Sequence, residues 1–222
     1  HAPAIGMTLD GFPVGFAPDM EALQAFLNRR APGQGAYATA RKEADAPEFV
    51  SGLVEGHTCG APLCAIIRNS DTRSKDYGNI ARSPRPSHAD FTAHVKYGGQ
   101  EDVRGGGHFS GRITAALVAA GAICHSALAR KGITIGTHIS RCSGVPDRGF
   151  EDLSADISAL SERLFPVLDK AAGEKMEAAI LAAKAEGDSV GGVLETAIVG
   201  LPAGVGEPWF DTFESVLSHM LF

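Results

Sequence analysis

Three consecutive glycines between two arginines are the part of this sequence whose residue types best suit chemistry, in Arg104-Gly-Gly-Gly-His-Phe-Ser-Gly-Arg112. Glycine lets the backbone adopt conformations, and approach a ligand, in ways that a β-carbon forbids. Residues 113–131 have helix-forming composition, and Gly132 is a stop signal. A glycine loop that leads into a helix points free N–H groups and the positive end of the helix dipole at one place. The segment therefore predicts an anion site, most often for phosphate, with a tight turn before a packed helix as the alternative.

Two other irregular segments carry side chains that transfer protons or bind anions. Arg85-Pro-Ser-His-Ala-Asp90 places His88 in a proline-containing loop beside a carboxylate. Histidine is the side chain most easily poised to transfer a proton near neutral pH. Arg29, Arg30 and Arg41 flank a loop rich in glycine and alanine. His88 is thus a candidate general acid or base and the arginines are candidate anion ligands, against a structural histidine and plain surface charge.

Two apparent motifs fail when their neighbouring residues are considered. After the glycines, Arg112 and Ile113 stand where a P-loop has its lysine and its metal-holding hydroxyl, so an ATPase is not expected. Gly187-Asp-Ser-Val-Gly-Gly192 resembles the nucleophile loop of trypsin-like proteases, but Val190 is an extra residue and a predicted helix precedes it. A serine hydrolase is therefore not expected either. Five histidines carry no pattern and are expected at structural or surface positions: His57, His94, His125, His138 and His219.

Composition limits the class of protein. The chain has 222 residues, which suit one large domain or two small ones, and 44% of them are hydrophobic. A mean hydropathy of +0.01, and the lack of a run approaching the roughly 20 apolar residues that a bilayer requires, predict no membrane partner. A net charge of -6 argues against nucleic acid as a partner. The cysteines have no CxxC spacing and indicate reduced thiols of a cytoplasmic protein, without a metal site: Cys59, Cys64, Cys124 and Cys142.

Periodicity and turn residues predict strands and helices in mixed order. Strands are expected over residues 4–9, 48–55, 63–68, 133–140 and 193–199. Helices are expected over residues 19–30, 113–131, 160–168, 174–185 and 215–222, the last of them entering a core. Residues 69–86 are polar and turn-rich, which predicts a long functional loop. Because no regular βαβ order appears, the pattern favours α+β layers over a doubly wound sheet.

Taken together, the motifs resemble the chorismate synthase family over essentially the whole chain. Each motif alone is weak, but the set occurs in the family's order: His1-Ala-Pro-Ala-Ile-Gly, Gly11-Phe-Pro-Val-Gly15, Arg29-Arg30, Arg85-Pro-Ser-His-Ala-Asp90, Lys96-Tyr-Gly98, the glycine segment 104–112, Gly187-Asp-Ser-Val-Gly-Gly192 and Pro202-Ala-Gly-Val-Gly-Glu-Pro208. The family is longer, with a short strand before this sequence and a portion after it. The resemblance implies one α+β domain over residues 1–222, truncated at both ends. Its expected fold is a β-α-β sandwich with helices packed between antiparallel sheets.

The resemblance also implies a reaction. Members of the family are lyases at the last step of the shikimate pathway, which leads to aromatic amino acids. They remove phosphate and a ring proton from 5-enolpyruvylshikimate 3-phosphate, an anti-1,4-elimination that yields chorismate. They require reduced FMN (FMNH2), with NADPH as the reductant where the protein reduces its own flavin, and the complete protein is expected to be a homotetramer. The alternative is a non-catalytic fragment that binds a phosphate ligand, inactive because the C-terminal flavin-binding portion is absent.

Family roles carry over to eight positions. Two are catalytic histidines: His1, near the leaving phosphate, and His88, which protonates reduced flavin. The residues that match the flavin-contacting stretch are His108, Phe109 and Ser110. The arginines expected to bind the phosphate and carboxylates of the substrate are Arg30, Arg41 and Arg112.

The chain departs from the family pattern at three places. Ala36 stands where many members have another active-site arginine, and Ala2 replaces the glycine that usually follows the first histidine. His108-Phe109 replaces the commoner Arg-Ser, which indicates a subfamily variant. The missing arginine predicts a weaker or rebuilt set of anion ligands.

Overall fold

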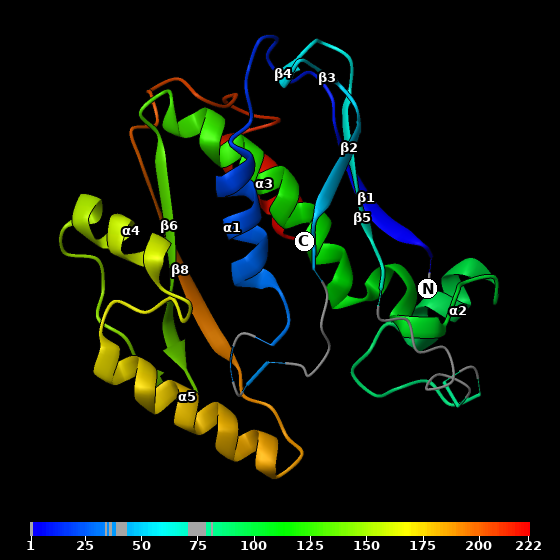
Figure 1. Cartoon of the computed structure of the whole chain (residues 1–222). Helices are drawn as coiled ribbons and strands as arrows, with labels where there is room; N and C mark the ends of the chain where they lie inside the picture. Colours follow the sequence, from blue (N-terminus) through cyan, green and yellow to red (C-terminus); the bar gives the residue numbers. More distant parts are fainter. Residues whose placement is uncertain (1, 34, 36, 39–43, 71–78, 81) are drawn as a thin grey trace. The chain divides into compact units, whose positions relative to one another are not determined.

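Three antiparallel strands form the sheet of the first half of the chain, in the order β1-β5-β2 (Figure 1). The computed structural model describes residues 2–33, 35, 37–38, 44–70, 79–80 and 82–222. Strand β1 is Ala4–Leu9, β2 is Pro47–Ser51 and β5 is Leu63–Arg68. Alternate side chains of β5 are buried, as expected of a strand with one face on a core. The predicted bounds of 4–9 and 63–68 are confirmed.

The predicted strand 48–55 is interrupted. Gly52 has a φ of +88°, and a Cβ there would lie 2.5 Å from the Cα of Leu63. Only glycine fits this close approach. The chain therefore leaves the sheet after β2 and forms a separate two-stranded ribbon, in which β3 (Leu53–Val54) pairs with β4 (His57–Thr58).

Helices α1 (Met20–Arg30) and α3 (Thr114–Ala129) pack on one face of the three-stranded sheet (Figure 1). Asp19 caps α1 by accepting a hydrogen bond from the backbone N–H of Ala22 at 2.9 Å. Two 3-10 turns, η2 (Arg104–Phe109) and η3 (Gly111–Ile113), precede α3. The core beneath the sheet consists of Phe16, Leu23, Leu27, Leu63, Ile67, Ala115, Ala119, Ala122 and Ile123.

One helical run is long and apolar enough to cross a membrane, which was not expected from the sequence. Residues 111–129 have the length and the mean hydropathy, 1.5, that a membrane-crossing helix would need. The core helix of a soluble protein satisfies the same criterion, and Ala115, Ala119 and Ile123 of α3 are buried against the sheet. The expectation that no run approaches this length was therefore wrong. The contacts of α3 with the sheet bury 28% of this run.

A second three-stranded antiparallel sheet, in the order β7-β6-β8, organises the later part of the chain. Its strands are β6 (Thr134–Cys142), β7 (Val145–Pro146) and β8 (Gly192–Val199). Helix α4 (Leu153–Glu162) packs against β6 and β8, and α5 (Lys170–Ala185) packs against β7. A Cβ on Gly136 would lie 2.8 Å from Cγ1 of Ile157, so the glycine lets α4 come close to β6. The core of this sheet contains Cys142, Val167 and Met176.

The helices differ from the prediction at three places. The predicted helix 160–168 is wrong, because α4 ends at Glu162 and the guanidinium of Arg163 binds the carbonyl oxygen of Leu168 at 3.0 Å. Helix α2 (Asp90–Tyr97) was not predicted. Helix α6 (Phe213–Leu221) was predicted within two residues, but none of its residues is buried.

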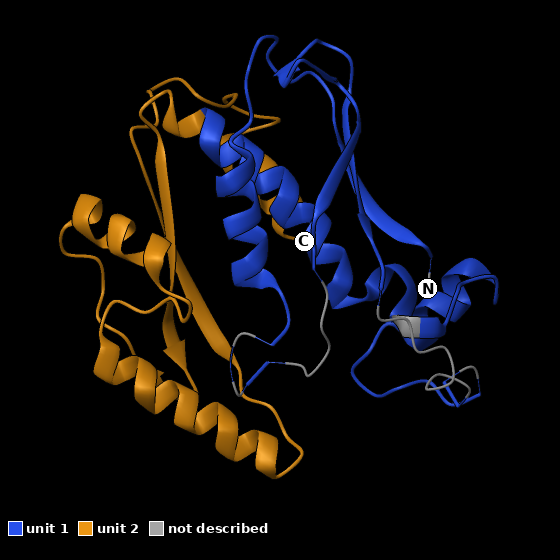
Figure 2. Cartoon of the chain, viewed as in Figure 1, with its two compact units in different colours: residues 1–127 blue, residues 128–222 orange. Residues whose placement is uncertain are grey.

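The chain divides into two compact units, unit 1 over residues 1–127 and unit 2 over residues 128–222 (Figure 2). Antiparallel sheets with helices packed on them, in mixed order, confirm the α+β class. The single domain over residues 1–222, truncated at both ends, stays a prediction.

Candidate functional site

Two of the arginines predicted to bind substrate, Arg30 and Arg112, converge on one carboxylate in unit 1. Nη1 of Arg30 donates to Oδ2 of Asp45 at 3.0 Å, and Nη1 of Arg112 donates to Oδ1 of Asp45. The side chain of Asp45 is fully buried, while those of Arg30 and Arg112 are 22% and 18% exposed. Two cations therefore share one anion.

Several elements position these arginines. Arg30 is the last residue of α1, and it donates through Nε to Oγ1 of Thr114 at 3.2 Å and through Nη2 to the carbonyl oxygen of Gly111 at 3.0 Å. Arg112 lies in η3 and donates through Nε to Oδ1 of Asn69 at 3.0 Å. The cluster thus joins the end of α1, the residue after β5 and the start of α3. Because each guanidinium is held at more than one nitrogen, its plane is fixed.

His88, predicted as a catalytic histidine, lies in a cluster with Arg85 and Asp90. Nδ1 of His88 is 2.7 Å from Oδ1 of Asp90, and Arg85 binds both oxygens of Asp90, at 2.8 Å and 2.9 Å. The hydrogen bond from the Arg85 side chain, which outweighs burial, holds the pKa of Asp90 far below its usual range. Asp90 is therefore ionised at neutral pH and fixes Nδ1 of His88 as a hydrogen-bond donor.

The glycine segment packs against this histidine. Gly106 has a φ of +83°, and a Cβ there would lie 3.3 Å from both Cε1 and Nε2 of His88. The segment does not lead directly into α3, because η3 intervenes, and Arg104 forms an exposed ion pair with Asp102 at 2.7 Å. The glycines thus bring the backbone to the face of His88. The arginine of this segment that joins Arg30 and Asp45 is Arg112.

The predicted flavin-contacting residues lie beside an aromatic group. Nε2 of His108 is 3.2 Å from the hydroxyl of Tyr97, and the rings of His108 and Phe109 have centroids 4.4 Å apart. Phe109 is 42% exposed. Ser110 accepts a hydrogen bond from the backbone N–H of Arg112 at 3.2 Å and so begins η3. A pocket of about 90 Å³ lies between α2 and the glycine segment and is lined in part by His108 and Phe109.

The segment 104–112 connects the three groups of side chains. It lies against His88 at Gly106, carries His108 and Phe109, and ends at Arg112, which binds Asp45. The predicted site residues His1 and Arg41, and the substituted position Ala36, lie outside the described residues. The roles assigned to all eight positions stay predictions.

Sequence reasoning assigned no role to Asp45, Asn69 and Tyr97, which hold the predicted residues in place, although Asn69 begins the predicted functional loop and Tyr97 lies in the motif Lys96-Tyr-Gly98. Asp45 lies 67 residues from Arg112 and 15 from Arg30, and no local pattern relates a carboxylate to arginines at such separations. For Asp45 the available signal was the density of arginines around residues 29–41, which implies a counter-charge nearby.

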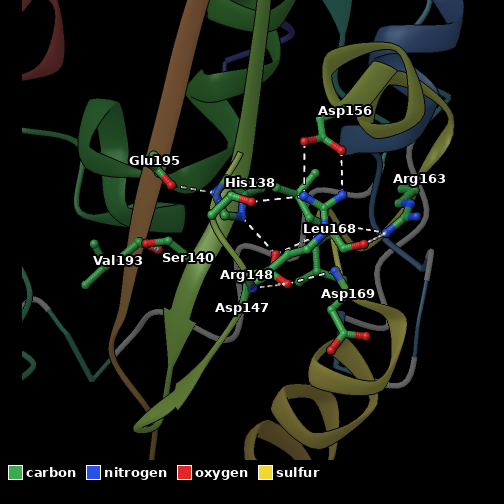
Figure 3. Close-up of polar contacts among 12 residues, drawn as sticks. His138, Ser140, Asp147, Arg148, Asp156, Arg163, Leu168, Asp169, Val193 and Glu195 are labelled. Carbon is green, nitrogen blue, oxygen red and sulfur yellow. Dashed lines mark hydrogen bonds and ion pairs between the residues drawn. The ribbon is translucent and has the colours of Figure 1, made fainter. Parts of the chain in front are cut away.

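Unit 2 holds a second polar cluster, around His138 (Figure 3). His138 is fully buried on β6, with Nδ1 2.8 Å from Oδ2 of Asp147 and Nε2 2.8 Å from Oε2 of Glu195 on β8. Asp147 also accepts hydrogen bonds from the backbone N–H groups of Leu168 at 2.6 Å and Asp169 at 2.8 Å. Burial acts to raise the pKa of Asp147, but these hydrogen bonds outweigh it, so the pKa lies below its ordinary value. The expectation of a structural position for His138 agrees with this burial.

The His138 cluster does not have the form of a metal site. Across the part of the chain that the structure describes, no group of three or more histidine, cysteine, aspartate or glutamate side chains could hold a metal ion. The cluster joins β6, β8 and the start of α5, which makes it a structural element of unit 2.

Comparison with known proteins agrees with the sequence resemblance. The family model for chorismate synthase matches residues 1–222. The chain is 39% identical to the chorismate synthase of Lancefieldella parvula, covering 100% of this chain and 62% of that protein. It is 43% identical to that of Sulfurimonas denitrificans, covering 100% of this chain and 60% of that protein. A crystal structure of chorismate synthase superposes with a TM-score of 0.69 at 25% identity, covering 93% of this chain and 57% of that one.

The chain thus spans about 60% of the length of the curated relatives that it matches. Within that span the match is continuous from the first residue to the last. This chain belongs to the chorismate synthase family.

Proposed function

We propose that this chain carries the anion-binding and proton-transferring part of a chorismate synthase. The protein would remove phosphate and a ring proton from 5-enolpyruvylshikimate 3-phosphate by anti-1,4-elimination and release chorismate. The observation that carries the proposal is the convergence of Arg30 and Arg112 on buried Asp45, next to the segment 104–112, in a chain that matches the family throughout.

The arginine cluster suits a phosphorylated, carboxylated substrate. Arg30 makes one described hydrogen bond through each of its three nitrogens, and a guanidinium has five N–H groups. It therefore has N–H groups left for a ligand anion. When the carbon–oxygen bond to the phosphate breaks, negative charge develops on the oxygen of the leaving phosphate. A cation already held in place stabilises that charge without reorganisation.

His88 suits proton transfer at the same segment. Asp90 holds Nδ1 of the ring as a donor, so a neutral His88 has Nε2 as its acceptor nitrogen, which lies next to Gly106 and 3.3 Å from the donor Nη2 of Arg85. A histidine oriented by a carboxylate is the usual form of a general acid or base. We therefore propose that His88 is the residue that protonates reduced flavin, as the family resemblance implies.

The residues next to the pocket suit a flat aromatic cofactor. Tyr97, His108 and Phe109 form a contiguous aromatic group, and Phe109 keeps exposed surface on which a ring can stack. These residues would hold one part of reduced FMN, while the glycines let the backbone come close. When bound, reduced FMN lends electron density to the reaction transiently and takes it back, so the elimination has no net redox change.

Binding and turnover with reduced FMN test this proposal, with the Sulfurimonas denitrificans protein as the active reference. We expect the chain to bind 5-enolpyruvylshikimate 3-phosphate in calorimetry, and Glu48→Gln, in an exposed pair with Arg68, to leave that binding unchanged. Chorismate formation would support the enzyme. Binding without turnover would support the alternative, a phosphate-ligand binding fragment. Absence of both, while the reference protein is active, would refute the proposal.

A further inference from the structure

We infer that Asp45 is a positioning residue, which holds Arg30 and Arg112 in the orientation that binds the substrate anion. The inference rests on the proposed function. Asp45 cannot meet the substrate itself, because its side chain is fully buried. It acts only through the two arginines, one on each carboxylate oxygen.

The geometry favours positioning over simple charge balance. A carboxylate needed only for neutralisation could lie anywhere near the arginines. Asp45 instead lies between them, and the Nε atoms of Arg30 and Arg112 are held separately by Thr114 and Asn69. Each guanidinium is thus fixed at two or more corners, which leaves it little rotational freedom to lose when an anion binds.

The backbone at Asp45 supports a specific role for its side chain. Its φ is +46°, in the left-handed region that non-glycine residues rarely adopt. Glycine would adopt this conformation more easily, and strained backbone that persists is found most often at functional sites. Asparagine tolerates the same region, so an Asp45→Asn variant changes the charge and leaves the backbone preference similar.

Charge balance and positioning predict opposite signs for that variant. If Asp45 merely neutralised the cluster, its replacement by asparagine would make the net charge more positive by one and strengthen anion binding. If it positions the arginines, the replacement removes the carboxylate between two facing cations and leaves one neutral carbonyl oxygen in place of the two oxygens that each bound an arginine. The two arginines then repel and turn apart, and anion binding weakens although the positive charge has increased.

Calorimetry distinguishes these outcomes. We expect Asp45→Asn and Asp45→Gly each to raise the Kd for 5-enolpyruvylshikimate 3-phosphate about tenfold or more, the equivalent of losing one charge-assisted hydrogen bond. Glu48→Gln, which also removes one negative charge but lies on the exposed edge of the sheet, should leave the Kd within about twofold. Unchanged or tighter binding in a folded Asp45→Asn variant would overturn the inference.

Two further measurements make the test independent of activity and of whether the variants fold. In the folded wild-type chain, NMR should resolve separate, slowly exchanging Nη protons for Arg30 and Arg112, and freely rotating groups would overturn the inference. In a folded Asp45→Asn variant, both arginines should react with phenylglyoxal faster than in the wild type, with Arg68 as the internal reference. If the wild type binds no substrate, the proposed function fails, whereas these arginine measurements still decide the role of Asp45.

Discussion

Replacing Asp147 by alanine removes the acceptor at the centre of the cluster in Figure 3. Four donors lose their partner: Nδ1 of His138 and the backbone N–H groups of Leu168, Asp169 and Arg148, all within 2.9 Å of the carboxylate. The bond from Asp169 is exposed and the bond from Arg148 is local, one residue along the chain, so we count neither of them in the estimate. Each of the other two hydrogen bonds to a charged group contributes about 1.5–3 kcal/mol, so we expect unit 2 to lose about 3–5 kcal/mol of unfolding free energy.

The loss should depend on the acceptor and not only on the volume of the side chain. Asp147→Asn keeps the shape and one carbonyl oxygen, but its amide NH₂ must face a donor. We expect a loss of about 2 kcal/mol, between those of the wild type and Asp147→Ala. Asp188→Ala is the matched control, because Asp188 is exposed and accepts only from the neighbouring N–H of Ser189 among the bonds described. Its effect should stay within about 0.5 kcal/mol.

Urea denaturation, combined with hydrogen exchange of the β6 and β8 amides, measures these differences. Hydrogen exchange shows whether the loss of unfolding free energy lies in the sheet that holds His138. An unchanged m-value shows that unfolding exposes the same surface area in the variant and the wild type. A loss below about 1 kcal/mol in Asp147→Ala would refute the reasoning, because it would place the four hydrogen bonds among ordinary surface contacts.

Four further outcomes follow from the structure. In the complete enzyme, Gly106→Ala places a methyl group 3.3 Å from His88 at a φ of +83°, and turnover should fall about 10²-fold, as it does when a catalytic group is displaced by about 1 Å. His88→Ala should cut turnover by ~10²–10⁴-fold with little change in substrate affinity, and an unchanged rate with reduced flavin would remove His88 from the candidates. Arg112→Ala should weaken substrate binding at low and high ionic strength alike, whereas a loss under about 0.5 kcal/mol that salt abolishes would indicate a surface charge. Hydrogen bonds from the side chains of Arg85 and Arg148 hold the pKa values of Asp90 and Asp156, respectively, below their ordinary range. The stabilisation from these carboxylates is complete above about pH 5 and is lost progressively as the pH falls below about 4 toward the folded pKa values. A urea midpoint that does not drop from pH 6 to pH 3 would contradict this.

Local residue patterns predicted the elements whose periodicity is strong. The strands over residues 4–9 and 63–68 were found at the predicted bounds, because alternation between buried and exposed positions is a property of neighbouring residues. The start of α1 followed from Asp19, whose capping hydrogen bond reaches only three residues along the chain. Motif order likewise identified the family before any contact was known.

Elements that depend on distant contacts were not predictable in this way. Helix α2 is only 8 residues long, and its apolar side chains Phe91 and Val95 are exposed and do not pack on a core. The break between α4 and α5 is held by Arg163, whose guanidinium binds carbonyl groups that a continuing helix would have used. Composition alone does not show such a competition between side chain and backbone.

The sequence by itself determined which residue types could bind an anion and transfer a proton, and that they occur in the order of the chorismate synthase family. Only the tertiary structure decided that Arg30 and Arg112 share Asp45, that Gly106 lies against His88, and that His138 is buried between two carboxylates. The physical reason is that ion pairing and desolvation depend on distance in space. Asp45 and Arg112 are 67 residues apart, and Glu195 and His138 are 57 apart, so folding alone brings each pair into contact and buries the side chains of Asp45 and His138.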